Sequence, residues 1–311
     1  MRFLLKLIFI RYVLRDIVIK SIWPNFFIVG AHKGGTTSLY EYLTQVPDIY
    51  MSKMKEPHFF APNVQPTSKF PYKVIRSEQK YLDLFKDGET KLAVGEASTS
   101  YLWDPKSPHL ISEKIPNAKI IMILRDPVTR AFSHYLMSFR GGVETLPFYD
   151  ALVKDYALQR KGFGISNLYI ELGFYSEQVK KYLEIFGKEN VKILIFEEFI
   201  QNTEHSVIDT LKFLRIQSKV PNNIDTAYNS FFVPRNNLVL SLLRNRAVSA
   251  LAGTLPTSLI DWLRGNKLLF KKTGKPQISA KERQFLTEIY RDDVAALSSI
   301  LGRRLPWTCQ F

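Results

Sequence analysis

The sequence is poor in cysteine and in acidic residues. Its 311 residues include a single cysteine, Cys309, which excludes a disulfide framework and a cysteine-based zinc site. There are 29 Asp and Glu residues against 43 Lys and Arg residues, so the formal net charge is +14 at pH 7. This excess predicts an anionic partner, and nucleic acid, anionic lipid, acidic glycan and nucleotide all satisfy that description.

An uninterrupted apolar run of membrane-spanning length is also missing at the start of the chain. Residues 3–22 are largely apolar but carry a charge every four or five positions. A spanning helix needs about 20 predominantly apolar residues, and each central Arg or Asp costs about 2.5–3.5 kcal/mol on insertion. Residues 1–24, with five basic residues and one acidic residue, are therefore predicted to form a basic amphipathic segment. Two interpretations stay open: residues 1–22 lie peripherally on an anionic membrane surface, or they pack on the protein body.

The rest of the chain has the composition of a folded domain. Hydrophobic residues make up 46% and aromatic residues 13%, which is enough to bury a sizeable core and excludes wholesale disorder. Short apolar runs alternate with helical patterns, which favours a parallel sheet covered on both faces. The sequence predicts one α/β domain over residues 25–311, with a P-loop-like parallel β-sheet flanked by helices on both faces. The expected strands are 25–30, 91–95, 119–124 and 191–196, and the expected helices lie near 36–45, 77–86, 127–140, 168–187, 203–214 and 279–301.

A glycine-rich turn, Gly30-Ala-His-Lys-Gly-Gly-Thr-Thr-Ser-Leu39, follows the first expected strand. Such a turn between a strand and a helix presents backbone N–H groups and the positive end of the helix dipole, so it can bind an anion. A loop for a nucleoside triphosphate carries a lysine directly after its last glycine. Here that position is Thr36, and the lysine, Lys33, comes earlier, where it can lean over a bound anion toward a leaving group. An ordinary glycine turn is the alternative, but the flanking strand and helix favour an anion site.

A second candidate anion site follows the expected strand at 119–124. Arg125 comes at the carboxyl end of this strand, where open α/β sheets bind their ligands. Asp126 and Pro127 are typical of the N-cap and first turn of a helix, and Ser133 lies two turns along it. By themselves these residues are better explained structurally, with Arg125 paired to a carboxylate and Ser133 on the helix surface.

Taken together, these segments resemble a known family. AHKGGTTSL after one strand and ILRDPVTRAFSHY after a later one resemble the two cofactor-binding motifs of the sulfotransferases. The chain is most similar to the glycan-modifying branch, which includes the heparan sulfate sulfotransferases. The segments KMKEPHFF, GEASTSY, GFY, KKTGKP and GRRLPW match that branch in order and spacing, over residues 53–60, 95–101, 173–175, 271–276 and 302–307. The resemblance extends from about residue 25 to 307.

The resemblance implies a reaction and roles for individual residues. Members of this branch transfer the sulfuryl group of 3′-phosphoadenosine 5′-phosphosulfate (PAPS) to an acceptor hydroxyl or amine, so PAPS is expected as co-substrate and no metal is expected. Glu56 matches the catalytic base, with His58 beside it, and Lys33 would stabilise the leaving group. The implied cofactor contacts are Lys33, Gly34, Gly35, Thr36, Thr37 and Ser38 for the 5′-phosphosulfate, Arg125 and Ser133 for the 3′-phosphate, and Lys271, Lys272, Gly274 and Lys275 in a loop closing over the nucleotide.

Partners and location are implied in the same way. The acceptor would be a carbohydrate or a glycolipid, and no nucleic acid would be bound. His32 stands where some glycan-modifying relatives carry a basic side chain, and residues 96–98 lack the lysine of the animal enzymes. The disulfide that precedes the late loop in the animal enzymes is also absent, because Cys309 is alone. The chain therefore resembles a microbial or cytosolic member, expected in the cytoplasm with peripheral contact to the inner face of a membrane as an option.

Two other classes of protein remain as alternatives. A P-loop nucleotide kinase or NTPase would share the fold, but it is disfavoured by Thr36 and because the strand at 119–124 ends in Arg125 where such proteins place an aspartate. A non-catalytic basic protein that binds nucleic acid or membrane would explain the charge. It would show steep salt dependence of binding, but it gives no reason for Lys33, Glu56 and Arg125 to match a cofactor site.

Deleting residues 1–22 tests the amphipathic segment. We expect the truncated protein to bind vesicles of anionic lipid more weakly than the full chain in a sedimentation assay, because it has lost the clustered basic residues. Nucleotide binding should be unchanged, and neutral vesicles serve as the control. Equal binding of both forms to anionic vesicles would favour the interpretation in which this segment packs on the protein.

Overall fold

The computed structural model describes residues 22–221, 224, 233–234, 270–271, 276–307 and 309. The predicted segment 1–24 thus falls almost entirely outside the described residues. The elements, in chain order, are β1 (Phe26–Gly30), α2 (Thr36–Thr44), β2 (Ile49–Met51), α3 (Glu78–Leu82), η1 (Lys86–Gly88), β3 (Ala93–Ala97), α4 (Ser100–Trp103), α5 (Ser107–Lys114), β4 (Lys119–Leu124), α6 (Pro127–Arg140), α7 (Phe148–Tyr156), η2 (Glu171–Gly173), α8 (Ser176–Phe186), η3 (Lys188–Asn190), β5 (Val191–Ile195), α9 (Phe196–Gln201), α10 (Thr203–Phe213), β6 (Val233–Pro234), β7 (Phe270–Lys271) and α14 (Ala280–Leu301).

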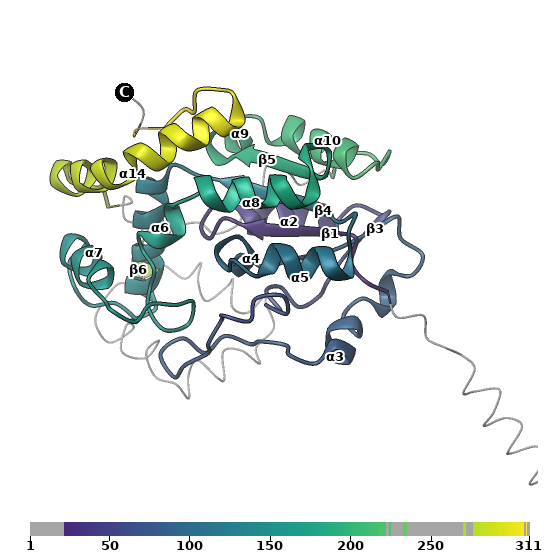
Figure 1. The fold of residues 1–311 in the computed structure, drawn as a ribbon, viewed down its shortest axis with the longest axis horizontal. Coiled ribbons are helices and arrows are strands. Elements are labelled where there is room, and N and C mark those ends of the chain that lie inside the picture. The colour runs from purple at the N-terminus through teal and green to yellow at the C-terminus, as the bar shows by residue number, and fades with distance from the viewer. Residues whose placement is uncertain are drawn as a thin grey trace, which may run out of the picture.

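A five-stranded parallel sheet forms the centre of the fold, in the order β2-β3-β1-β4-β5. Helices cover both of its faces, as predicted, and Figure 1 shows α4, α5 and α8 together on one of them. Alternate residues of β1 enter different cores: Phe27 and Val29 pack in the larger core with these helices, and Phe26 and Ile28 pack in a smaller core with α2 and α10. Because β3 and β4 flank β1, the carboxyl ends of these three strands lie side by side.

One expected strand begins later in the structure than predicted, and one strand of the sheet was not predicted. The strand expected at 91–95 is β3, which begins two residues later because Lys91 and Leu92 are exposed. It continues through Glu96, whose buried carboxylate is satisfied by hydroxyl groups. Strand β2 was not expected, because three residues at a sheet edge carry too little apolar pattern to be recognised.

Several helices also differ from the expectation. The helix expected at 168–187 begins at Ser176, because the Asp293 carboxylate of α14 accepts hydrogen bonds from the N–H groups of Tyr175 and Ser176, at 2.7 and 3.1 Å. This cap comes from a distant part of the chain and has no local signal. The helix expected near 77–86 is the shorter α3 followed by η1, and α4, α5, α7 and α9 are additional. Helices α2, α6, α10 and α14 agree with the prediction to within about a residue.

Candidate active site

The loop after β1 packs its backbone directly on β4. The N–H of Ala31 donates to the carbonyl oxygen of Ile123 at 2.9 Å. A Cβ on Gly34 would lie 2.3 Å from the same oxygen, so no larger residue fits there without moving the backbone. Gly35 has a φ of 94° and precedes α2, and a Cβ there would lie 3.0 Å from the Phe196 ring. The two glycines thus fix the loop at the start of α2, whose first-turn N–H groups have no partner within the helix.

Lys33 lies at the tip of this loop in the left-handed conformation, with a φ of 65°. Its ammonium group donates to the sulfur of Met137 on α6 at 3.6 Å. Burial lowers the pKa of Lys33 to about 8, with help from the charges of Arg125, Arg140 and Lys55, while the nearby Glu56 opposes the shift. This cation is therefore held in a crowded positive environment, where a bound anion would be stabilised.

Arg125 joins the two predicted anion segments. Its guanidinium donates to the carbonyl oxygen of Lys33 at 3.3 Å and to the hydroxyl of Thr129 at 3.2 Å, and it stacks 4.5 Å from the centre of the Phe196 ring. Both hydrogen-bond acceptors are neutral, contrary to the alternative in which Arg125 pairs with a carboxylate. Asp126 caps α6 through the N–H groups of Val128 and Thr129, as predicted.

The other predicted cofactor residues fall into three groups. Thr36, Thr37 and Ser38 form the first turn of α2, where Thr36 is buried and the other two are partly exposed. Ser133 is partly exposed on α6, one turn beyond Thr129. Lys271 is described only through its backbone, which pairs in β7 with Val233 of β6, and Lys272, Gly274 and Lys275 lie outside the described residues.

Glu56 and His58 lie in a turn that projects toward the carboxyl end of β3. Both have positive φ values, 60° and 54°, and such conformations cost non-glycine residues of order 1–3 kcal/mol each. The Glu56 N–H donates to the carbonyl oxygen of Ala97 at 2.9 Å, and the His58 N–H donates to the hydroxyl of Ser98 at 3.2 Å. The surrounding structure thus fixes a strained turn that bears two of the predicted catalytic residues.

The Glu56 carboxylate has three side-chain neighbours. Lys55 lies 3.1 Å from Oε1, the Thr99 hydroxyl donates to Oε2 at 3.1 Å, and Nε2 of His58 lies 3.6 Å from Oε2. Burial raises the pKa of Glu56, but the positive charge of Lys55 and the two histidines His58 and His32 outweigh it, so the net pKa lies below the usual range. A surface carboxylate paired with Lys53 or Lys55 is the other interpretation of Glu56 from the sequence, and the Lys55 pair is present in the structure. The carboxylate also contacts Thr99 and His58, and its lowered pKa keeps it ionised near neutral pH.

His58 is buried beneath this carboxylate. Its Nδ1 lies 2.7 Å from the hydroxyl of Ser100, and its ring packs against Tyr72 and Phe163. Burial lowers the pKa of His58, with Glu56 opposing, so the neutral imidazole is the favoured form. These contacts indicate that His58 orients Glu56. They are less suited to a residue that exchanges protons with solvent.

Thr99 and His32 are the site residues that the sequence did not single out as catalytic or cofactor-binding. Thr99 Oγ1 contacts both Glu56 and His32, and its distance from Nδ1 of His32 is 3.4 Å. Burial lowers the pKa of His32 to about 3, and its ring packs edge-on against His134, with centroids 4.5 Å apart. The signal for Thr99 was its place in the GEASTSY segment, but nothing local indicated which hydroxyl would reach Glu56.

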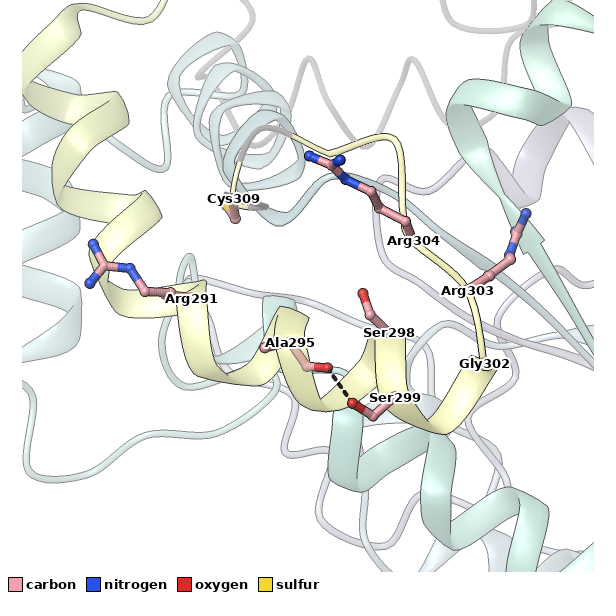
Figure 2. A pocket seen from close by; sticks show the side chains of 8 residues that line it. All are labelled: Arg291, Ala295, Ser298, Ser299, Gly302, Arg303, Arg304 and Cys309. Carbon is pink, nitrogen blue, oxygen red and sulfur yellow. Dashed lines mark hydrogen bonds between the residues drawn. The ribbon is translucent and has the colours of Figure 1, made fainter.

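A separate cavity lies elsewhere on the molecule. It measures about 1020 Å³ and is bounded by the C-terminal half of α14 and the turn that follows it (Figure 2). Arg291, Arg303 and Arg304 line it, and Arg303 forms a bidentate ion pair with Glu198 at 2.8 and 3.0 Å. None of the predicted site residues that the structure describes borders this cavity.

The part of the chain that the structure describes contains neither a metal centre nor a membrane-spanning helix. No group of three or more His, Cys, Asp or Glu side chains is arranged to hold a metal ion. No described helix combines the length and the apolar character needed to cross a bilayer.

The arrangement unites a basic, backbone-lined loop with an ionised carboxylate. Lys33 lies within electrostatic range of both Arg125 and Glu56. Cations and N–H groups on one side can bind and stabilise an anionic group, and a carboxylate on the other side can accept a proton. Such a site can transfer a charged group between two oxygen atoms.

Comparison with known proteins agrees with this chemistry. The family model described as "Sulfotransferase domain" matches residues 24–244, which is more than half of the chain. The crystal structure of a sulfotransferase from Alicyclobacillus acidocaldarius superposes with a TM-score of 0.69 at 32% identity, covering 91% of this chain and 98% of that one.

Curated relatives are more distant. Carbohydrate sulfotransferase 15 of Mus musculus is 27% identical over 250 residues, which cover 62% of this chain and 44% of the relative. Heparan sulfate glucosamine 3-O-sulfotransferase 6 of Homo sapiens is 26% identical over 198 residues, covering 64% and 54%. The chain thus matches about half the length of these relatives. The family match, the superposed structure and the shared motifs together establish that this chain belongs to the sulfotransferase family.

Proposed function

We propose that this protein transfers the sulfuryl group of PAPS to a hydroxyl or amine of a carbohydrate-containing acceptor. The observation that carries the proposal is the hydrogen bond from Arg125 to the carbonyl oxygen of Lys33. It brings the two anion-binding segments of the chain into one site, as a nucleotide with phosphate groups at both ends requires. Membership of the sulfotransferase family supports the same reaction.

The cations of this site fit an anionic nucleotide. Lys33 donates to a thioether sulfur and Arg125 to neutral oxygens, so their charges are available to an incoming phosphate or sulfate. We infer that Lys33, the N–H groups of residues 34–36 and the hydroxyls of Thr37 and Ser38 hold the 5′-phosphosulfate. Arg125 and Ser133 then hold the 3′-phosphate, and residues 271–275 close over the nucleotide.

Glu56 supplies the proton acceptor in this mechanism. The acceptor oxygen or nitrogen attacks sulfur, the bond from sulfur to the bridging oxygen of the nucleotide breaks, and Glu56 takes the acceptor's proton. Thr99 and His58 hold the carboxylate oxygen Oε2, and the lowered pKa keeps it ionised. Lys33 stabilises the negative charge that develops on the bridging oxygen of the leaving nucleotide.

A carbohydrate acceptor is supported by the names of the curated relatives. One is a carbohydrate sulfotransferase and the other acts on heparan sulfate glucosamine, and both match this chain over about half their length. A free polysaccharide and a glycolipid share the sugar hydroxyls that this site would use. Transfer of labelled sulfate from PAPS into polysaccharide, glycolipid and small-molecule fractions of a host extract would separate them.

The nucleotide site can be tested by ligand-dependent stability. We expect adenosine 3′,5′-bisphosphate to raise the melting temperature, because a ligand at 100 times its Kd adds about 2.7 kcal/mol to the free energy of unfolding. Differential scanning fluorimetry with and without the nucleotide measures this shift. A clear shift with ATP and Mg²⁺, and none with the bisphosphate, would instead identify a kinase or NTPase.

Two substitutions test the assigned roles. We expect Lys33→Ala to lower kcat by about 10²–10³-fold, through loss of leaving-group stabilisation, and Glu56→Gln to lower it by about 10²–10⁴-fold, through loss of the base. Calorimetric affinity for adenosine 3′,5′-bisphosphate should change far less in Glu56→Gln than kcat does. Lys53→Ala is a matched control, because this neighbouring lysine pairs with Asp87 outside the site. Full activity of Glu56→Gln would refute the base assignment.

The lowered pKa of Lys33 predicts a pH dependence. The ammonium form binds anions, and its pKa is about 8 in the free protein, so the charge is present below pH 8 and is lost as the pH rises through it. We therefore expect kcat/KM for PAPS to fall above about pH 8. A pH–rate profile of the wild type and of Lys33→Arg, which stays charged, checks this. If kcat/KM falls at the same pH in both proteins, the decline belongs to a group other than Lys33.

A further inference from the structure

Glu96 of β3 is a buried carboxylate to which the proposed reaction assigns no role. It is fully inaccessible to solvent, and its partners are three hydroxyl groups. Tyr81 and Tyr101 donate to Oε1 at 2.6 and 2.7 Å, and Ser98 donates to Oε2 at 2.7 Å. All three donors are neutral, so hydrogen bonds compensate this buried charge where an ion pair would be usual.

The carboxylate determines the direction of these hydrogen bonds. A hydroxyl has a single hydrogen, so donation to Glu96 leaves only its oxygen lone pairs for other partners. The oxygen of Ser98 accepts the N–H of His58 at 3.2 Å, and the oxygen of Tyr101 accepts the N–H of Phe60 at 3.3 Å. Tyr81 donates to the same carboxylate but accepts no N–H from residues 56–60 among the described contacts.

These two N–H groups belong to the strained turn that carries the base. Glu56 and His58 both have positive φ values, so the turn keeps its shape only where outside contacts fix it. The N–H groups of residues 56, 58 and 60 all bind residues 97–101, and two of the three bind through hydroxyls that Glu96 orients. His58 in turn lies 3.6 Å from the carboxylate of Glu56.

The pKa of Glu96 sets the pH above which the ionised form of this arrangement prevails. Burial raises its pKa to about 7, the hydroxyls of Tyr81, Ser98 and Tyr101 oppose the shift, and the charge of Glu56 adds to it. Burial raises the pKa of Tyr182 on α8, and the charge of Glu96 adds to this shift. The ionised carboxylate accepts all three hydrogen bonds, whereas a protonated one has to donate and would displace one hydroxyl hydrogen.

We propose that Glu96 is a positioning residue, which orients the Ser98 and Tyr101 hydroxyls so that they hold the turn at residues 56–60 and thereby place Glu56 for catalysis. The proposal rests on the proposed function, in which Glu56 is the base. Glu96 acts through these hydroxyls and does not touch the reacting atoms.

Glu96→Gln tests the proposal, because glutamine keeps the shape of the side chain but replaces one acceptor oxygen with a donor. At a pH between the pKa values of Glu96 and Lys33, we expect kcat to fall about 10- to 100-fold, as misplaced catalytic groups do. The Kd for adenosine 3′,5′-bisphosphate should stay within about twofold of the wild type. Amide hydrogen exchange of His58 and Phe60, measured by NMR, should become faster.

Tyr81→Phe is the matched control. It removes a hydrogen bond to the same carboxylate oxygen but keeps the ring that stacks on Phe59, 4.1 Å away, and it leaves both turn contacts in place. The hydrogen bond from Tyr81 lowers the pKa of Glu96, so the variant is compared at a pH at which its Glu96 is still ionised. There we expect wild-type exchange at residues 58 and 60. Ser98→Ala removes the hydrogen bond from Ser98 to Glu96 and the His58 contact, but it keeps the Phe60 contact with Tyr101. It serves if Glu96→Gln does not fold, and it should lower kcat and expose the His58 amide.

Wild-type kcat together with wild-type amide exchange in Glu96→Gln, or in Ser98→Ala in its place, would overturn the proposal. Equally fast exchange in Tyr81→Phe, at a pH at which its Glu96 is ionised, would also overturn it, because the effect would then not depend on the Ser98 and Tyr101 contacts. If the wild type transfers no sulfuryl group, the proposed function fails. The exchange rates at residues 58 and 60 still decide whether Glu96 holds the turn.

Discussion

The candidate site depends on one backbone contact, between the loop after β1 and strand β4. The N–H of Ala31 donates to the carbonyl oxygen of Ile123, and a Cβ on Gly34 would lie 2.3 Å from the same oxygen. Because the loop is pressed onto this strand, Arg125, two residues further along the chain, reaches the carbonyl oxygen of Lys33. A larger residue at position 34 would lift the loop from the strand and separate the two cations.

Burial and the neighbouring cations both lower the pKa of Lys33, whereas at Glu56 burial and the neighbouring charges act in opposite directions. Lys33 is surrounded by other cations, and its pKa is lowered, so it gains most from an anionic ligand. Glu56 has Lys55 and two histidines around it, and its pKa is lowered despite burial. Near neutral pH both groups are therefore in the protonation states that the proposed reaction needs, before any ligand contributes its own charge.

How closely the sequence predicts each part of the site depends on how far apart in the chain the contacting residues lie. The loop at 30–38 and the Asp126 cap are local patterns of glycine, proline and capping residues, so they were predicted closely. The contact between Thr99 and Glu56 joins residues 43 positions apart, and no local pattern selects Thr99 from its neighbouring hydroxyls. The start of α8 was misplaced for the same reason, because its cap comes from α14.

That cap also has a consequence for the order in which the protein is made. Asp293 binds Ser176 across 117 positions, and the neighbouring Tyr175 donates its hydroxyl hydrogen to the carbonyl oxygen of Arg125 at 3.0 Å. Until residue 293 has been synthesised, the start of α8 lacks its cap. Tyr175, which donates to the carbonyl oxygen of Arg125, then also lacks its hydrogen bond to Asp293. The surroundings of Arg125 are therefore complete only after α14 has been synthesised and has docked.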